Sequence, residues 1–85
     1  MADLPSHATL EQTLAAAGAA HEDYERGVLK GVVDPQWAGF YAAYVLGRLG
    51  DFAPAGRLAT LLAEVDAEGE WEATAAEHVL MKLRS

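Results

Sequence analysis

Cysteine is absent from this sequence, and several other residue types are scarce. Without a thiol the chain can form no disulfide, no thiol nucleophile and no thiolate metal site. Serine occurs only at Ser6 and Ser85, so the folded segments between them offer no serine nucleophile. Isoleucine is also absent, and valine and threonine are few, whereas β-strands favour such β-branched residues. These shortages exclude thiol chemistry and argue against a β-sheet.

Basic residues are scarce as well, because 6 Lys+Arg stand against 13 Asp+Glu and give a formal net charge of −7. Such a surface repels phosphate backbones, which disfavours nucleic-acid binding. A helix-turn-helix is disfavoured too, since the region around Arg57 and Thr60 offers few basic or amide side chains. No apolar run reaches the roughly 20 residues that span a membrane, and the first residues do not resemble a signal peptide. We therefore expect a cytoplasmic protein with neither a nucleic-acid nor a membrane partner.

What the chain has in abundance is alanine, with 18 among 85 residues, and alanine is the best helix former. A chain of this length holds one small core and no second domain. The spacing of apolar residues predicts helices over about residues 9–30, 35–49, 54–68 and 70–83. The predicted fold class is all-α, a compact four-helix bundle-like array forming one domain over residues 1–85.

Capping residues indicate where the first two helices begin. A capping box at Thr9 and Gln12 predicts a start near Thr9, and Ser6 is a second possible cap one turn earlier. Asp34 suits the N-cap of the second helix, and Pro35 suits its first position. That helix is apolar nearly all round, so we expect it to be the most buried.

Small residues recur every fourth position of the second helix, at Gly39, Ala43 and Gly47. Such a ridge lets another helix approach closely. We expect it to pack against the first or third helix of the same chain rather than to form a dimer seam.

A polar ring interrupts the apolar stripe of the first helix at His21, one turn before Glu25. A histidine there needs a hydrogen-bond partner, which Glu25 or a tyrosine of the second helix could supply. On one face of the second helix lie four large rings, from Trp37 to Tyr44. These rings could form the core, an interface or a ligand pocket. The candidate binding residues are His21, Tyr24, Glu25, Trp37, Tyr41 and Tyr44.

The fourth helix carries two apolar patches on roughly opposite sides. One of them contains Trp71 and His78, which we take as candidate interface residues. Together the second and fourth helices have more apolar surface than one small core can hide. We therefore expect the chain to associate with itself, as a homodimer, or with a protein partner.

Two further classes of function fail on specific residues. A di-iron bundle needs Glu three residues before each histidine ligand, but Gly18 and Ala75 stand before His21 and His78. An acyl carrier needs a serine at the start of its second helix, where this chain has Asp34 followed by Pro35. We accordingly expect no metal, no cofactor and no catalytic residue.

The pattern His21-x-x-Tyr24-Glu25, followed by Asp34-x-x-Trp37-x-x-Phe40-Tyr41-Ala42-x-Tyr44, resembles one found in small uncharacterised helical bacterial proteins. The resemblance covers residues from about Leu14 to Gly50 and implies no activity. The leading interpretation is a non-enzymatic accessory or interaction module that self-associates. The alternative is a small-molecule-binding or catalytic helical domain that uses a His/Glu/Tyr cluster between the first two helices.

Overall fold

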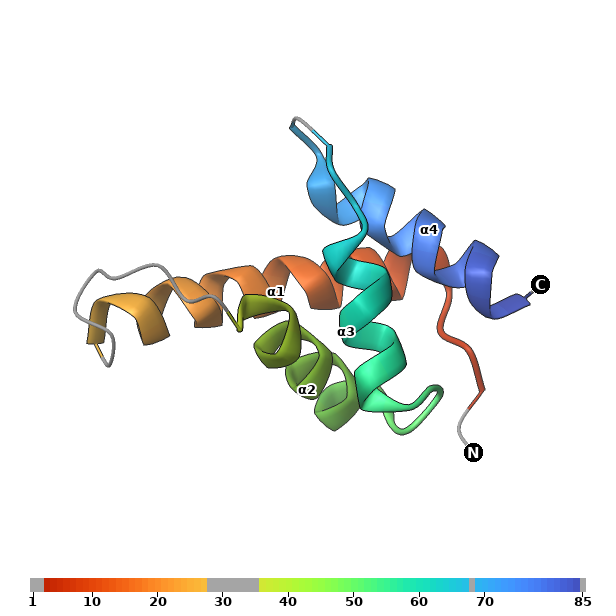
Figure 1. Cartoon of the computed structure of the whole chain (residues 1–85), viewed down its shortest axis with the longest axis horizontal. Helices are drawn as coiled ribbons and strands as arrows, with labels where there is room; N and C mark the ends of the chain where they lie inside the picture. The colour runs from red at the N-terminus through yellow and green to blue at the C-terminus, as the bar shows by residue number, and fades with distance from the viewer. Residues whose placement is uncertain (1–2, 28–35, 68, 85) are drawn as a thin grey trace.

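The computed structural model describes residues 3–27, 36–67 and 69–84, and these form four helices and no strand (Figure 1). The helices are α1 (His7–Gly27), α2 (Trp37–Leu49), α3 (Ala55–Ala63) and α4 (Trp71–Arg84). The predicted all-α, bundle-like array is therefore confirmed. None of the helices in this described part combines the length and the apolar character needed to cross a membrane.

Each helix packs against two others. α1 and α3 both contact α2 and α4, so the four helices surround one core (Figure 1). Leucine, valine and alanine side chains dominate this core, and removing them from water is the main force that holds the helices together. The completely enclosed side chains include Leu10, Leu14, Ala17, Val45, Leu58, Leu62, Ala75, Ala76 and Val79.

The start of α1 follows the second of the two predicted caps. The Ser6 Oγ accepts the Thr9 N–H at 3.1 Å, and the Leu10 N–H donates to the Ser6 carbonyl at 3.0 Å. The predicted start at Thr9 is wrong, because Ser6 caps the helix one turn earlier and Thr9 lies inside it. His7 lies in the first turn of α1.

The boundaries of the other helices also differ from the predicted ones. Asp34 and Pro35, the predicted cap of α2, lie outside the described residues, and so does the predicted end of the first helix. α3 ends at Ala63, well before the predicted residue 68. The last turn tightens there, with the Val65 N–H donating to the Leu62 carbonyl at 3.3 Å, and the Val65 carbonyl accepts the Trp71 Nε1–H at 3.2 Å, which joins the connection to α4.

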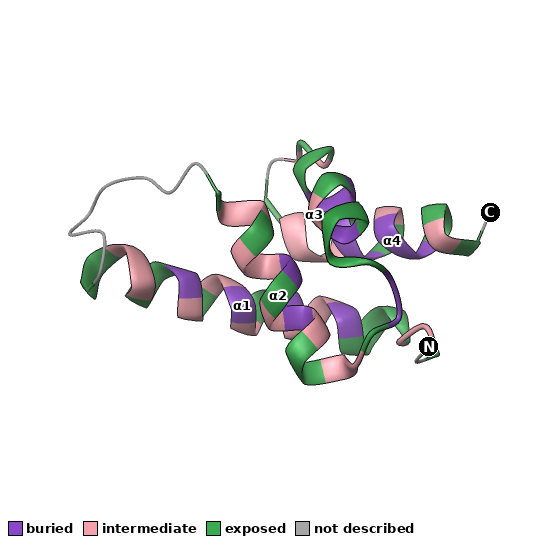
Figure 2. Cartoon of the chain, turned by 60° about the horizontal axis from the view of Figure 1, so that its bottom comes forward, coloured by how far each residue is buried: buried purple, intermediate pink, exposed green. Residues whose placement is uncertain are grey.

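α2 is less buried than the sequence suggests (Figure 2). Among the described residues it buries Ala42 and Val45, whereas α3 buries three side chains and α1 and α4 bury four each. The expectation that the second helix is the most buried is therefore wrong. Its large rings lie at the edge of the core, where they are half-buried rather than enclosed.

The small residues of α2 face outward. Gly39, Ala43 and Gly47 are exposed, and a Cβ added to either glycine would meet nothing within 4 Å. The predicted packing of this ridge against α1 or α3 is wrong, because α1 packs on the aromatic side of α2 instead. We call these three residues, with the half-buried Phe40, Tyr44 and Leu46 beside them, the outer face of α2.

Ser6→Ala should destabilise the protein by roughly 0.5–2 kcal/mol, because the substitution removes the acceptor for the Thr9 N–H. Thr13→Ala is the control, since its hydroxyl only bonds the Thr9 carbonyl within the helix, and we expect a change within about 0.5 kcal/mol. Urea unfolding followed by circular dichroism measures both. Equal effects of the two substitutions would show that Ser6 is not the cap.

Candidate binding site at the junction of α1, α2 and α4

Six rings from three helices meet at one side of the core. We call this group the aromatic cluster: His21, Tyr24, Trp37, Phe40, Tyr41 and Trp71. Five of these residues come from α1 and α2, as the spacing of the sequence suggests. Trp71, from the first turn of α4, joins them and ties α4 to α2.

Three rings of the cluster pack edge to face. The centroids of Trp37, Tyr41 and Trp71 lie 5.4 to 5.6 Å apart, and their planes are inclined by 75° to 85°. This is the arrangement that aromatic quadrupoles favour. The hydrogen bond from Trp71 Nε1 to the Val65 carbonyl fixes the third ring. The group is therefore held in place by both α2 and the α3–α4 connection.

His21 is the buried polar residue of the cluster, with 6% of its surface exposed. Its ring lies 5.0 Å from Phe40 and 5.5 Å from Tyr41 between centroids. Its Nδ1 atom is 3.7 Å from the Glu25 Oε1 atom, which is ion-pair range but longer than a hydrogen bond. The predicted proximity of His21 and Glu25 is present, and aromatic rings pack on the imidazole.

Tyr41 occupies the centre of the junction. Its Oη atom would lie 3.1 Å from a Cβ at position 18, so the glycine there lets the ring approach α1 closely. Burial raises the pKa of Tyr41, and the carboxylates of Glu72 and Glu25 raise it further. Carboxylates from two helices, Glu25 on α1 and Glu72 on α4, therefore both raise the pKa of the Tyr41 hydroxyl. Glu72 is not among the residues that the sequence predicts for this site, because its position next to Tyr41 depends on how α4 packs.

Two of the predicted site residues lie apart from the cluster. Tyr44 accepts a hydrogen bond from the Arg48 guanidinium at 3.1 Å, and that guanidinium lies over the Tyr44 ring, 5.6 Å from its centroid. His78 pairs with Glu64 at 2.9 Å and so links the end of α3 to α4. His78 and Trp71 thus contact adjacent residues at the end of α3, Glu64 and Val65.

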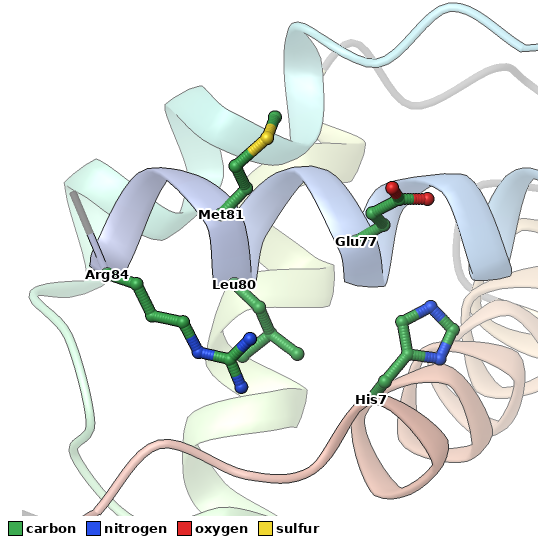
Figure 3. A pocket seen from close by; sticks show the side chains of 5 residues that line it. All are labelled: His7, Glu77, Leu80, Met81 and Arg84. Atoms are coloured by element: carbon green, nitrogen blue, oxygen red, sulfur yellow. The ribbon is translucent and has the colours of Figure 1, made fainter.

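A pocket of about 430 Å³ lies between the start of α1 and the last turns of α4 (Figure 3). It is lined by His7, Glu77, Leu80, Met81 and Arg84. The His7 Nε2 atom is 3.1 Å from the Ala73 carbonyl oxygen, which anchors this end of α1 on α4.

Two more pockets, of about 460 and 470 Å³, border the α2–α3 connection. None of the three pockets is lined by a residue of the aromatic cluster.

The junction combines packed rings with the carboxylates of Glu25 and Glu72. Its polar groups pack against rings, and within the described ranges no three histidines or acids lie close enough to share a metal ion. The rings of Trp37, Tyr41 and Trp71 remain partly open to solvent, beside the carboxylate of Glu72. Aromatic side chains are enriched at protein interfaces.

Stability should fall as the pH rises above 10.0, the ordinary pKa of tyrosine, because the pKa of Tyr41 is raised in the folded protein. The unfolded chain then loses the Tyr41 proton at a lower pH than the folded chain, so alkaline conditions favour unfolding. Thermal melts between about pH 9 and 11 measure this loss, and Tyr41→Phe should reduce it. Tyr44→Phe is the control, and an equal reduction in both variants would contradict the assignment.

No family model, no curated protein and no solved structure matches this chain. The resemblance of residues Leu14 to Gly50 to small helical bacterial proteins therefore stays a prediction. What the protein does must follow from the chain's own residues and their contacts.

Proposed function

We propose that this chain is a non-enzymatic interaction module of the bacterial cytoplasm, which forms a homodimer through the outer face of α2. One observation carries the proposal. α2 is the most apolar of the four helices, yet it buries the fewest side chains among the described residues. A helix that is apolar nearly all round is normally covered on all sides. A second molecule would provide the missing cover.

Charge favours a second copy as that molecule. The chain has a net charge of −7, so two copies repel each other over most of their surfaces. α2 contains no carboxylate, and its one charged residue is Arg48. The outer face of α2 is therefore a place where two identical acidic molecules meet with little repulsion.

The shape of this face also supports close contact. Gly39 and Gly47 leave the backbone uncovered, so another helix can approach it, and Phe40 and Tyr44 offer rings of the kind enriched at interfaces. Leu46 continues the face into a pocket of about 460 Å³, which Ala53, Pro54 and Ala55 also line, with the carboxylate of Asp51 at its edge. The apolar surface thus extends beyond α2 to the α2–α3 connection.

The alternative, a ligand or catalytic site built from His21, Glu25, Tyr41 and Tyr44, has weaker support. His21 is enclosed by rings, and Tyr44 contacts Arg48 instead of the cluster. The pockets described above lie elsewhere. A substrate would need space beside these groups, and interaction through a surface does not.

Sedimentation equilibrium at ~100 µM should give a mass near twice the 9.0 kDa of the chain. Ala43→Glu should return the monomer mass, because it places a carboxylate at the centre of the outer face. Ala15→Glu makes the same change at an exposed position of α1 and should leave the dimer intact. Circular dichroism checks that both variants remain helical.

Two results would contradict this proposal. One is a mass of 9.0 kDa for the unmodified chain at every concentration up to ~1 mM. The other is a dimer that Ala43→Glu and Ala15→Glu weaken equally, since the outer face of α2 would then not be the interface.

A further inference from the structure

We propose that the aromatic cluster is a second, separate docking point, where Trp37, Tyr41, Trp71 and Glu72 receive an arginine side chain from a segment of a partner protein. These four residues lie at the junction of α1, α2 and α4, and none of them belongs to the outer face of α2, although Phe40, another ring of the cluster, does. The rings of Trp37, Tyr41 and Trp71 are half-buried, so each is held by the core while part of its surface reaches solvent.

Charge at the junction is negative. Glu72 makes no ion pair or hydrogen bond within the described part of the chain, and its carboxylate is close enough to Tyr41 to raise the pKa of that hydroxyl. Glu25 acts on the same hydroxyl from α1. Aromatic faces attract cations, and a carboxylate beside them adds a charge-assisted hydrogen bond. The site is thus complementary to a cation.

The protein already contains one contact of this type. On the same helix as Trp37 and Tyr41, the Arg48 guanidinium lies over the Tyr44 ring and donates to its hydroxyl. A guanidinium is planar, weakly hydrated and able to stack on a ring while it bonds a carboxylate, which an ammonium group does less well. For these reasons we assign arginine, rather than lysine, to the site.

We assign the bound arginine to another protein, because two described arginines of this chain already contact other side chains. Arg48 contacts Tyr44, and Arg26 pairs with Asp23 one turn away on α1. Arg57 and Arg84 lie beside the pockets at the far end of α4, so they could reach the junction only from a second copy. The experiment separates that source from a partner segment.

Tryptophan fluorescence reads this site directly, because Trp37 and Trp71 are the two tryptophans of the chain. The probe is the synthetic peptide acetyl-Gly-Leu-Arg-Leu-Gly-amide, and the control is the same peptide with neutral citrulline in place of arginine. We expect a saturable change in fluorescence with the arginine peptide and binding weaker by about tenfold with citrulline. Equal titrations by the two peptides would overturn the proposal.

Matched variants test the carboxylate. Glu72→Gln should weaken binding of the arginine peptide by about three- to tenfold, whereas Glu77→Gln, which removes the same charge on another side of α4, should leave it unchanged. Equal losses in both variants would mean that net charge, not this site, attracts the peptide. If Glu72→Gln lowers the melting temperature, Tyr41→Leu provides the second test, and undiminished binding there would overturn the proposal.

A second copy is the remaining source of arginine. Fluorescence that changes with protein concentration alone, and no longer does so in the Arg57→Gln/Arg84→Gln double variant, would assign the site to self-association and overturn the partner segment. The Ala43→Glu variant should bind the peptide as the unmodified chain does. This result keeps the docking point independent of the dimer, because either one can fail while the other stands.

Discussion

The fold depends on a core of leucine and alanine side chains that lets the four helices pack closely. Leu10, Leu14, Leu58 and Leu62 are fully enclosed, and alanines such as Ala75 and Ala76 let the helices approach between them. A core of this width has little room for large rings. Phe52 is enclosed, whereas the other six phenylalanine, tyrosine and tryptophan side chains are half-buried at the edge. The aromatic character of the surface is therefore a consequence of the alanine-rich core.

Much of the fold was predictable because it follows from local chemistry. The apolar stripe predicted for the first helix comprised Leu10, Leu14, Ala17, His21, Tyr24 and Val28. The first four are buried, since spacing along a helix determines which side chains share a face, whereas Tyr24 is half-buried and Val28 lies outside the described residues. Helix ends were harder to predict, because Ser6 and Thr9 are both good N-cap residues and their types alone do not rank them. The hydrogen bond between Trp71 and Val65, beyond the end of α3, joins two positions that no local pattern pairs.

In the candidate site, too, local contacts were predictable and contacts that depend on tertiary packing were not. The proximity of His21, Tyr24 and Glu25 follows from one turn of helix, and their contact with Phe40 and Tyr41 follows from pairing the two apolar stripes. The arrival of Trp71 and Glu72 could not be read from spacing, because it depends on how α4 packs across α1. The outward orientation of Gly39 and Gly47 was misjudged for a related reason. When a helix is apolar nearly all round, its sequence does not show which side is buried, because that depends on where the neighbouring helices pack.

α2 thus has two sides, an aromatic side that packs against α1 and Trp71 and an outer face on which Gly39, Ala43 and Gly47 are exposed. The claim that a second copy covers the outer face is tested most directly by nuclear magnetic resonance with a soluble paramagnetic gadolinium chelate. The account predicts that the amides of Gly39, Ala43 and Gly47 broaden strongly in dilute protein and become protected as the protein concentration rises. Amides of exposed α1 residues such as Ala15 should broaden equally at every concentration. Broadening of the three α2 amides that does not change with concentration would contradict the claim.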